Sequence, residues 1–431
     1  MISKVAFHTL GCKLNFSETS TIGKQFINKG FVVVDFNDKA DVYVINTCTV
    51  TENTDRECRQ IVRRALRNNP NAFIAVTGCY AQVRPEEISE IKGVDIVLGT
   101  NEKFDIFSYI KNFEKNELSC IHVTPTEELN TFYAAYSTEA DNRTRAFLKI
   151  QDGCDYKCSF CTVPLARGGS RSLDLVNVIS EFKTLLNSGY KEIVLTGVNV
   201  GDYGKSFDID FYHLLEEIVQ IPGDYRVRIS SIEPNLLSND IINLTVQNNK
   251  LCNHFHIPLQ SGSDKILRLM QRRYTTKDYK DVVLKAASKI DSLGIGVDVI
   301  VGFPGETEED FKETYNVLLE LPISYLHVFT YSERPNTKAL GFDGIVDVIE
   351  RKRRNNMLRD LSEKKRYKYY QKMMGKEFTV LFENEPHGNF MKGFGSNYVR
   401  VIHPYDGTLV NKFVKVKIKE VNKNICTVEI I

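Results

Sequence analysis

Short apolar runs alternate with amphipathic stretches along the first hundred residues. The apolar runs cover residues 4–10, 41–46, 72–77 and 94–98. Helical patterns lie between them, at residues 17–29 and 54–68. Strand–helix alternation at this spacing is typical of a parallel α/β sheet. We therefore expect an open parallel α/β domain over residues 1–112.

A second alternating series follows a polar, aperiodic stretch at residues 113–140, which we expect to be a linker. Six apolar runs predict strands, at residues 146–150, 192–196, 226–230, 254–257, 296–301 and 325–331. Helical patterns such as 173–188 and 308–320 separate them. Six strand–helix units are too few for a complete eight-fold barrel. The pattern predicts a partial (βα)6 barrel over residues 141–370.

The pattern changes again near the carboxyl end. Residues 349–376 read as one long helix, and the remainder alternates in short strands around turns. These predicted strands cover residues 377–382, 397–402, 412–420 and 425–430. Short alternating strands with Gly-containing turns indicate a small β-barrel over residues 371–431.

Composition narrows the class of protein. The chain has 431 residues, 42% of them hydrophobic and 26% charged, with a net charge of +1. These values exclude a chain that is mainly disordered and one that is uniformly basic. Ten cysteines are too dilute for a disulfide scaffold. The start shows no signal-peptide pattern and no apolar run approaches about 20 residues, so we expect a cytoplasmic protein that does not enter a membrane.

Three cysteines lie close together in a loop after the first predicted barrel strand. Cys154, Cys158 and Cys161 have the spacing C-x3-C-x2-C, which lets all three thiolates reach one metal centre. A tetrahedral zinc site needs a fourth ligand, and the next histidine is His213. A 4Fe–4S cluster held by three cysteines instead keeps one iron open for a small molecule. The alternatives are a structural metal knot or unpaired core cysteines.

This loop, with Phe160 before its last cysteine, resembles the radical S-adenosylmethionine superfamily. The resemblance implies that the amino and carboxylate groups of S-adenosylmethionine chelate the open iron. It also implies that one electron from the cluster breaks a carbon–sulfur bond and releases a 5′-deoxyadenosyl radical, which removes an unactivated hydrogen. In such enzymes the cofactor carries the difficult chemistry and the protein orients it.

Several residues at strand ends fit the same superfamily. The resemblance assigns the methionine amino group to Thr196, Gly197 and Asn199, the adenine to Ile300 and Gly302, and the catalytic mouth to Ser231, Glu233 and Gln260. Asp298 stands where the adenine motif often has glycine. Taken singly, glycine and serine after a strand are ordinary turn residues, and Glu233 and Gln260 are equally compatible with satisfied polar groups beneath the mouth.

Three further cysteines each follow a predicted strand of the first domain. Cys12, Cys48 and Cys79 are 36 and 31 residues apart, about one strand–helix unit each. Parallel strands one unit apart end on the same edge of a sheet, where open α/β sheets bind ligands. Gly11 and Gly78 beside them leave room for a bulky group. The spacing predicts a second three-thiolate cluster, although any one such cysteine alone is more often a structural residue.

The motifs around these cysteines resemble the amino-terminal domain of the methylthiotransferases. They read Gly-Cys-Lys-Leu-Asn from Gly11, Asn-Thr-Cys-Thr-Val-Thr from Asn46 and Gly-Cys-Tyr-Ala-Gln from Gly78. The family implies two 4Fe–4S clusters, a TRAM-type carboxyl-terminal barrel, and transfer of a methylthio group to an unreactive C–H carbon. The second cluster supplies or carries the sulfur, one S-adenosylmethionine methylates it, and another generates the radical. An external low-potential electron donor of flavodoxin or ferredoxin type is implied as well.

Family branches differ in substrate. The first two motifs look most like the branch that modifies N6-threonylcarbamoyladenosine beside the tRNA anticodon. The isopentenyladenosine branch tends to carry Tyr-Gly-Cys-Gln-Met-Asn, and the branch that modifies an aspartate of a small-subunit ribosomal protein tends to carry Gly-Cys-Pro-Lys-Asn. A non-catalytic iron–sulfur RNA-binding protein is the competing class. Reductive cleavage of S-adenosylmethionine distinguishes it from an enzyme.

Local charge favours RNA independently. Residues 351–376 hold 11 Lys and Arg against 2 Asp and Glu, which is the pattern expected of phosphate contacts. We expect such contacts from Arg351, Arg353, Arg354 and Arg366. Base stacking is expected from Tyr367, Tyr369 and Tyr370, and a smaller basic stripe runs through Arg56, Arg59, Arg63 and Arg67. The alternative for either stripe is a solvated helix face.

Overall fold

Six parallel strands form the sheet of the amino-terminal domain, in the order β2-β1-β3-β4-β5-β6. The computed structural model describes residues 3–431 except 49–51, 111, 138–143 and 385–387, and except the side chains of 52–55. The six strands are β1 (Lys4–Thr9), β2 (Val32–Val34), β3 (Val42–Thr47), β4 (Phe73–Gly78), β5 (Ile96–Leu98) and β6 (Cys120–His122). The predicted open parallel sheet is confirmed, and β1, β3 and β4 are neighbours in it.

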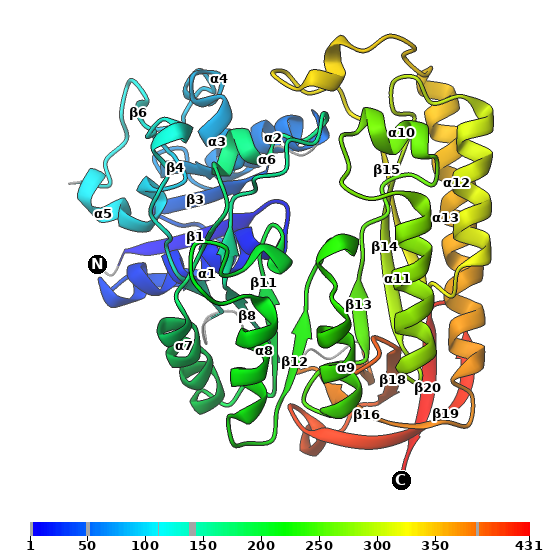
Figure 1. Ribbon diagram of the computed structural model, residues 1–431. Coiled ribbons are helices and arrows are strands. Elements are labelled where there is room, and N and C mark those ends of the chain that lie inside the picture. Colours follow the sequence, from blue (N-terminus) through cyan, green and yellow to red (C-terminus); the bar gives the residue numbers. More distant parts are fainter. Residues whose placement is uncertain (1–2, 49–51, 111, 138–143, 385–387) are drawn as a thin grey trace.

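Helices cover both faces of this sheet (Figure 1). On one face α1 (Lys13–Asn28) and α5 (Ile106–Tyr109) pack through Ile22, Phe26 and Ile106. On the other face lie α2 (Glu52–Asn68), α3 (Cys79–Val83) and α4 (Pro85–Ser89). Because both faces are covered, β3 and β4 are buried along their whole length, as parallel strands usually are.

The central domain is an open barrel of six parallel strands. They are β8 (Arg145–Lys149), β11 (Glu192–Thr196), β12 (Arg226–Ile229), β13 (His254–His256), β14 (Gly294–Val301) and β15 (Tyr325–Thr330). Single bridges, Val227 to Leu251 and Ser231 to His256, join the half that ends at β12 to the half that begins at β13. This arrangement confirms the predicted partial barrel.

Helices cover the outside of the barrel (Figure 1). The longer ones are α7 (Leu175–Asn187), α8 (Phe211–Gln220), α9 (Asn239–Gln247), α11 (Thr276–Lys289), α12 (Glu308–Glu320) and α13 (Val348–Lys372). Thr275 and Thr307 cap the starts of α11 and α12, and each forms a reciprocal capping box with the aspartate three residues on. Alternate strand residues such as Leu148 and Leu195 pack against these helices. Strand alternation therefore leaves polar side chains facing the barrel interior.

Five strands close into a small barrel at the carboxyl end. They are β16 (Glu377–Phe382), β17 (Phe390–Gly395), β18 (Arg400–Pro404), β19 (Phe413–Asn422) and β20 (Ile425–Ile430). This barrel docks at the amino-terminal ends of the core strands, where buried Arg226 and Arg228 both bind Glu192. The same two arginines donate to the carbonyl oxygens of Phe394 and Gly395 in the barrel. The docking therefore leaves the opposite end of the core strands for the cysteine loop.

The stretch expected to be a linker contributes strands to both domains. Within it, β6 joins the first sheet and β7 (Ala135–Tyr136) pairs with β8. The sequence pattern does not reveal these strands, because strands of two or three residues at sheet edges carry no detectable period. We propose residues 1–112, 141–370 and 371–431 as the three domains. The last turns of α13 pack against the small barrel through Tyr370, at the boundary between the second and third domains. No helix in the described part of the chain has the length and apolar character to cross a membrane.

Candidate active site

The first cysteine triad forms at the carboxyl ends of three adjacent strands. Cys12, Cys48 and Cys79 follow β1, β3 and β4. Gly11 has a φ of +101°, and a Cβ there would lie 2.8 Å from the Cys48 sulfur. Gly78 has a φ of +99°, and a Cβ there would lie 2.3 Å from the Thr47 carbonyl oxygen. Both glycines are therefore required for the backbone to bring the three cysteine loops together.

The second triad lies in a tightly closed loop after β8. Gly153 has a φ of +68°, and a Cβ there would lie 1.9 Å from the Gly169 carbonyl oxygen. The Cys154 amide donates to the Gly168 carbonyl oxygen at 3.0 Å, which fixes the start of the loop. Arg272 donates from Nη1 to the Cys158 sulfur at 3.2 Å. The loop is thus shaped by its glycines and held from across the barrel mouth by one arginine.

Two short helices that pack together connect the regions of the two triads. The helix α3 begins at Cys79 and packs against α6 (Val163–Arg167), which begins two residues after Cys161. Thr100 and Thr126 of the amino-terminal side donate to the carbonyl oxygens of Ala166 and Leu165 at 2.9 and 2.7 Å. The structure therefore brings together two cysteine sets that are separated by 75 residues of sequence, between Cys79 and Cys154.

The sulfur spacing is too wide for a single metal ion. Among the described residues, His256, Asp298 and His327 form the one group whose three ligand atoms lie within 4.8 Å of one another. Zinc–thiolate bonds of about 2.3 Å would hold three sulfurs at or inside that separation. Both triads are wider, which suits a multi-iron cluster. Burial is the main cause that raises the pKa of Cys154 and of Cys161 to about 12. The free thiols are therefore protonated near neutral pH and must lose protons when iron binds.

Thr196, Gly197 and Asn199 lie together at the end of β11, beside the Cys154 loop. The Asn199 amide nitrogen Nδ2 donates to Asp202 at 3.0 Å, while its buried Oδ1 has no hydrogen-bond partner among the described residues. A Cβ at Gly197 would lie 2.8 Å from Gln151 Oε1, so only glycine fits beside this side chain. The unpaired buried oxygen of Asn199 fits an ammonium donor. The Thr196 hydroxyl donates to the Leu148 carbonyl oxygen, so its proton is already engaged within the protein.

Ser231, Glu233 and Gln260 lie at the ends of β12 and β13, as predicted. Glu233 forms an ion pair with Arg272, the residue that also contacts Cys158. Gln260 has a φ of +65°, and its backbone pairs with β14 through the Ile300 amide. Ser231 pairs with His256 through the backbone. The Glu233 side chain is therefore tied to the cysteine loop. Gln260 and Ser231 pair with neighbouring strands through their backbone atoms.

The loop after β14 is held in place from outside the barrel. Ile300 and Phe160 of the cysteine loop both pack against the buried cluster that contains Phe303. Gly302 donates its amide to Glu306 Oε2 at 2.9 Å, and Glu306 Oε1 accepts from Arg354 Nη1 at 2.6 Å. Arg351 packs against Gly302, where a Cβ would lie 2.3 Å from its Cγ. The motif predicted to contact adenine is thus supported by two arginines of α13.

The prediction that Arg351 and Arg354 contact RNA phosphates is therefore wrong. Both side chains are buried, and both are paired inside the protein, Arg351 with Glu333 at 2.6 Å and Arg354 with Glu306 and Glu350. The helical period of α13 places them on the core side, a position that local charge counting does not reveal. Arg353 is exposed, and it pairs with Glu308 and Glu350.

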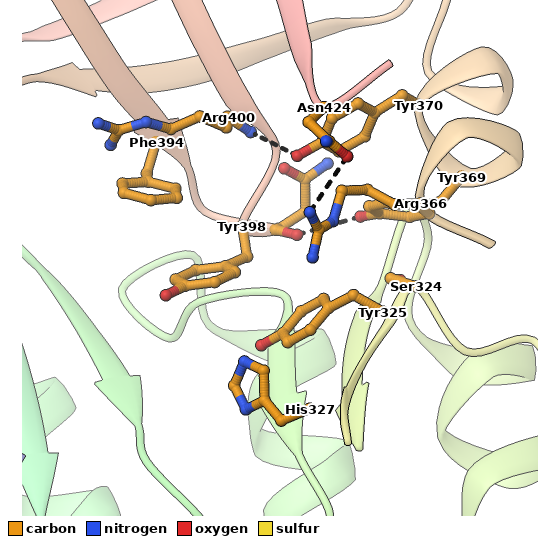
Figure 2. Close-up of a pocket in the computed structure, with 11 residues that line it drawn as sticks. Ser324, Tyr325, His327, Arg366, Tyr369, Tyr370, Phe394, Tyr398, Arg400 and Asn424 are labelled. Carbon is orange, nitrogen blue, oxygen red and sulfur yellow. Dashed lines mark hydrogen bonds between the residues drawn. The ribbon is translucent and has the colours of Figure 1, made fainter. Parts of the chain in front are cut away.

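Arg366 lies in a cavity of about 270 Å³ between the core and the small barrel (Figure 2). Its Nη1 donates to Asn424 Oδ1 at 3.2 Å, and its guanidinium lies over the Tyr325 ring. Tyr369 and Tyr370, which were expected to stack on bases, instead contribute to packing. The Tyr369 hydroxyl donates to Ser292 and Asn397, and Tyr370 is buried in the small-barrel core. Tyr367 is 40% exposed, as its prediction requires.

The basic stripe on α2 faces outward. Arg56, Arg59, Arg63 and Arg67 are all exposed, while Cys58, Ile61, Val62 and Ala65 of the same helix pack on the sheet. Arg59 lies 3.9 Å from Glu87. Four cysteines lie outside the two triads and share no regular spacing. Cys58, Cys252 and Cys426 are buried, and Cys120 is exposed.

Sequence reasoning assigned no role to several polar residues of the site. Asp298 accepts hydrogen bonds from His256 at 2.8 Å and His327 at 3.2 Å inside the barrel. Burial alone would raise the pKa of Asp298, but His256 and His327 lower it well below its ordinary value. Arg272 and a buried charge network around Glu18 were missed as well. The available signal for the network was a polar pair, Asn15 and Glu18, spaced by three on a helix face that is otherwise buried.

Comparison with known proteins agrees with this geometry. Residues 148–318 match the radical SAM superfamily, and residues 4–99 match an uncharacterized protein family, UPF0004. The chain is therefore a radical S-adenosylmethionine protein with a second cysteine-bearing domain.

Curated relatives narrow the class. The chain is 42% identical to a threonylcarbamoyladenosine tRNA methylthiotransferase of Aquifex aeolicus, over 89% of this chain and 93% of the relative. It is 41% identical to the Bacillus subtilis protein of the same name, over 97% and 94%. A tRNA-2-methylthio-N(6)-dimethylallyladenosine synthase of Fusobacterium nucleatum is 35% identical, over 97% and 98%. The chain belongs to the radical S-adenosylmethionine methylthiotransferase family.

Solved structures share the fold. The radical S-adenosylmethionine methyltransferase TsrM from Kitasatospora setae, solved with cobalamin and a [4Fe-4S] cluster, has a TM-score of 0.57 at 16% identity. The match covers 79% of this chain and 77% of that one. At this identity the likeness supports the arrangement of an amino-terminal α/β domain on a partial barrel, and nothing finer.

Proposed function

We propose that this protein attaches a methylthio group to carbon 2 of N6-threonylcarbamoyladenosine next to the tRNA anticodon. The observation that carries the proposal is that α3, which begins at Cys79, packs against α6, which begins just after Cys161. This contact brings the regions of the two cysteine triads together. A reaction that makes a carbon–sulfur bond at an unreactive C–H carbon needs a radical source and a sulfur source close together. The names of the relatives at 42% and 41% identity support the substrate branch.

The residues present fit the groups that the family uses. Cys154, Cys158 and Cys161 would hold one 4Fe–4S cluster and leave an iron open for S-adenosylmethionine. Asn199 Oδ1, buried and without a partner among the described residues, would accept from the methionine ammonium. Cys12, Cys48 and Cys79 would hold the second cluster. Together these groups supply one-electron chemistry that removes an unactivated hydrogen and delivers sulfur.

The chain itself holds these groups at fixed positions. Arg272 contacts both Glu233 and Cys158, so one side chain joins the cysteine loop to the end of β12. Arg354 and Glu306 fix the Gly302 amide and with it the loop after β14. Fixed positions matter because a misplacement of about 1 Å at a reacting centre can lower a rate about 10²-fold.

The tRNA contacts are proposed on two surfaces. Arg353 and Arg366 remain candidates, and the exposed lysines Lys364, Lys368 and Lys372 follow α13 at helical spacing. Arg366 lies beside Tyr325 and Asn424 in the cavity of Figure 2, where its guanidinium can still reach a phosphate at the cavity opening. The exposed arginines of α2 form the second surface, close in sequence to Cys48.

The proposal requires an external low-potential electron donor of flavodoxin or ferredoxin type, because the reaction begins with one-electron reduction. It also places the protein in the cytoplasm, where its tRNA substrate is found. The test is mass spectrometry of nucleosides from bulk tRNA of a strain that lacks the gene. Loss of 2-methylthio-N6-threonylcarbamoyladenosine, restored by the intact gene, supports the proposal. Loss of the isopentenyl derivative alone, or no change in either nucleoside, contradicts it.

A further inference from the structure

A buried group of charged side chains fills the junction between the two domains, beside both cysteine triads. Glu18 of α1 is at its centre and has no exposed surface. Its carboxylate binds Lys103 at 2.7 Å, Lys149 at 3.3 Å and Arg167 at 2.8 Å. Buried charges are costly unless they are paired and hydrogen-bonded. A cluster of this kind needs an explanation beyond stability, since apolar residues would fill the same space at lower cost.

Arg167 reaches from one cysteine loop to the other. It is the last residue of α6, the helix that begins just after Cys161. Its Nη1 donates to Asp152 Oδ1 at 3.0 Å, two residues before Cys154. Its Nη2 donates to Asn15 Oδ1 at 2.7 Å, three residues after Cys12. One planar guanidinium therefore links the start of α1 in the first domain to the start of the cysteine loop in the second.

Asn15 continues the link to the other loops of the first triad. Its Nδ2 donates to the Leu10 carbonyl oxygen at 2.8 Å and to the Thr47 carbonyl oxygen at 3.0 Å. Leu10 precedes Cys12 by two residues, and Thr47 precedes Cys48 directly. Any displacement of Arg167 would thus be transmitted to two of the three cysteine loops.

The network carries a surplus of positive charge. Its cations are Lys103, Lys149, Arg167 and Arg171, and its carboxylates are Glu18 and Asp152. The surplus is two positive charges among the described residues. Lys103 and Arg167 both bind the Glu18 carboxylate, and Arg167 also binds Asn15, three residues after Cys12, so both cations lie beside the first triad. An iron–sulfur cluster with three thiolates is an anion, because its ligands outweigh the charge of its core.

We propose that Arg167 is a positioning residue for sulfur transfer: it fixes the two cysteine triads relative to each other and supplies, with Lys103, the counter-charge for an anionic cluster at Cys12, Cys48 and Cys79. This inference rests on the second cluster of the proposed function. Reduction adds one more negative charge to that cluster. Removal of the arginine charge therefore makes reduction harder and lowers the midpoint potential.

The potential is measured on the second cluster alone. In a chain with Cys154, Cys158 and Cys161 changed to Ala, an anaerobic titration with dithionite, followed by electron paramagnetic resonance, reports the remaining cluster. Arg167→Gln should lower its midpoint potential, and Arg167→Lys should leave it near the parent value. Lys205→Gln is the matched control, since Lys205 is half exposed and pairs with Asp155 of the Cys154 loop, without reaching the first domain.

A double variant separates charge from geometry. Glu18→Gln with Arg167→Gln removes one charge of each sign, so the surplus of two is retained while the link to Asn15 is lost. The potential should return to the parent value. In the complete chain, transfer of the methylthio group should remain about 10²-fold down in both Arg167→Gln and the double variant, with S-adenosylmethionine cleavage within about twofold of wild type. In the single variant Glu18 keeps its ion pairs with Lys103 and Lys149, so that variant is expected to fold.

Two results would overturn the inference. An unchanged potential in Arg167→Gln, or a double variant that keeps the single variant's potential, would show that the charge does not act on the cluster. Wild-type methylthio transfer in Arg167→Gln would remove the positioning role while leaving the proposed function standing. If the wild-type protein modifies no tRNA but the potentials shift as described, the proposed function fails and the electrostatic part of the inference holds.

Discussion

Arg354 Nη1 lies 2.6 Å from Glu306 Oε1, and Glu306 in turn holds the backbone amide of Gly302. A long, basic helix that looks from sequence like an RNA surface therefore also supports the loop after β14, which is predicted to contact adenine. Burial has the largest effect on the pKa of Glu306 and raises it, while Arg354 opposes that increase. The charged form of Glu306 is therefore stabilised by Arg354.

The first prediction concerns this pair. Arg354→Glu should reduce S-adenosylmethionine cleavage, because two carboxylates would then face each other behind the Gly302 loop. Loss of one partner of a buried pair costs about 3–5 kcal/mol of stability, so urea unfolding should show the change as well. Arg359→Glu, on an exposed turn of the same helix, is the control and should leave cleavage unchanged. Equal cleavage in both variants would show that the loop does not need this support.

The second prediction concerns the exposed side of α13. Lys364, Lys368 and Lys372 are exposed, and no ion pair to a carboxylate is found for them in the described residues. Each phosphate contact should contribute about −0.7 to −0.9 to the slope of log affinity against log salt. Reversing all three lysines to Glu should flatten the slope for tRNA. Reversing Lys277, Lys285 and Lys289 on α11 should not, and an equal effect of the two sets would place tRNA elsewhere.

The third prediction concerns pH and the docking of the small barrel. Burial would raise the pKa of Glu192, but Arg226 and Arg228 lower it well below its ordinary value of 4.5. A lowered folded-state pKa stabilises the protein above the unfolded value and is lost as pH falls below about 4.5. The wild type should thus lose more stability between pH 5 and pH 3 than Glu192→Gln does, in urea unfolding followed by tyrosine fluorescence. Glu217→Gln, an exposed change on α8, should behave as wild type, and parallel curves for all three would contradict the assignment.

The fourth prediction concerns the glycine before Cys154. Gly153→Ala places a Cβ against the Gly169 carbonyl oxygen at a φ that favours glycine, so the loop cannot close. The reconstituted variant should hold about half the iron of wild type, with the Cys12, Cys48 and Cys79 cluster retained. Gly189→Ala is the comparison, because its φ of +88° is similar and its Cβ meets nothing within 4 Å. Full iron content in Gly153→Ala would show that the loop tolerates the side chain.

Much of the fold was accessible from the sequence because its strands are long, apolar and regularly spaced. The end of β11 at Thr196 and the whole of α12 were predicted to the residue. The two-residue β7 was missed because it is too short to show a period. The strand β17 was missed because two of its buried positions, Gly393 and Gly395, have no apolar side chain. Short edge strands are defined by their partners, and partners are set by tertiary contacts.

The candidate site was accessible where the chemistry lies in spacing. All six cysteines follow strands or lie in one loop, and their positions alone indicated two centres. Arg351 and Arg354 were misassigned because a local charge count takes no account of Glu306 and Glu333, which lie far away in sequence. Arg167 was missed for the same reason: its partners come from α1 and from Asp152 before the Cys154 loop, and only the folded chain brings these two segments together.

The central claim is that the two triads have separate tasks, one generating the radical and the other handling sulfur. The most direct measurement compares two triple Ala variants, one at Cys154, Cys158 and Cys161 and one at Cys12, Cys48 and Cys79. S-adenosylmethionine cleavage and methylthiolated threonylcarbamoyladenosine in tRNA are quantified for each. The account predicts that the first variant loses both activities, and that the second keeps cleavage but makes no methylthiolated nucleoside. Cleavage by the first variant, or methylthiolated tRNA from the second, would contradict it.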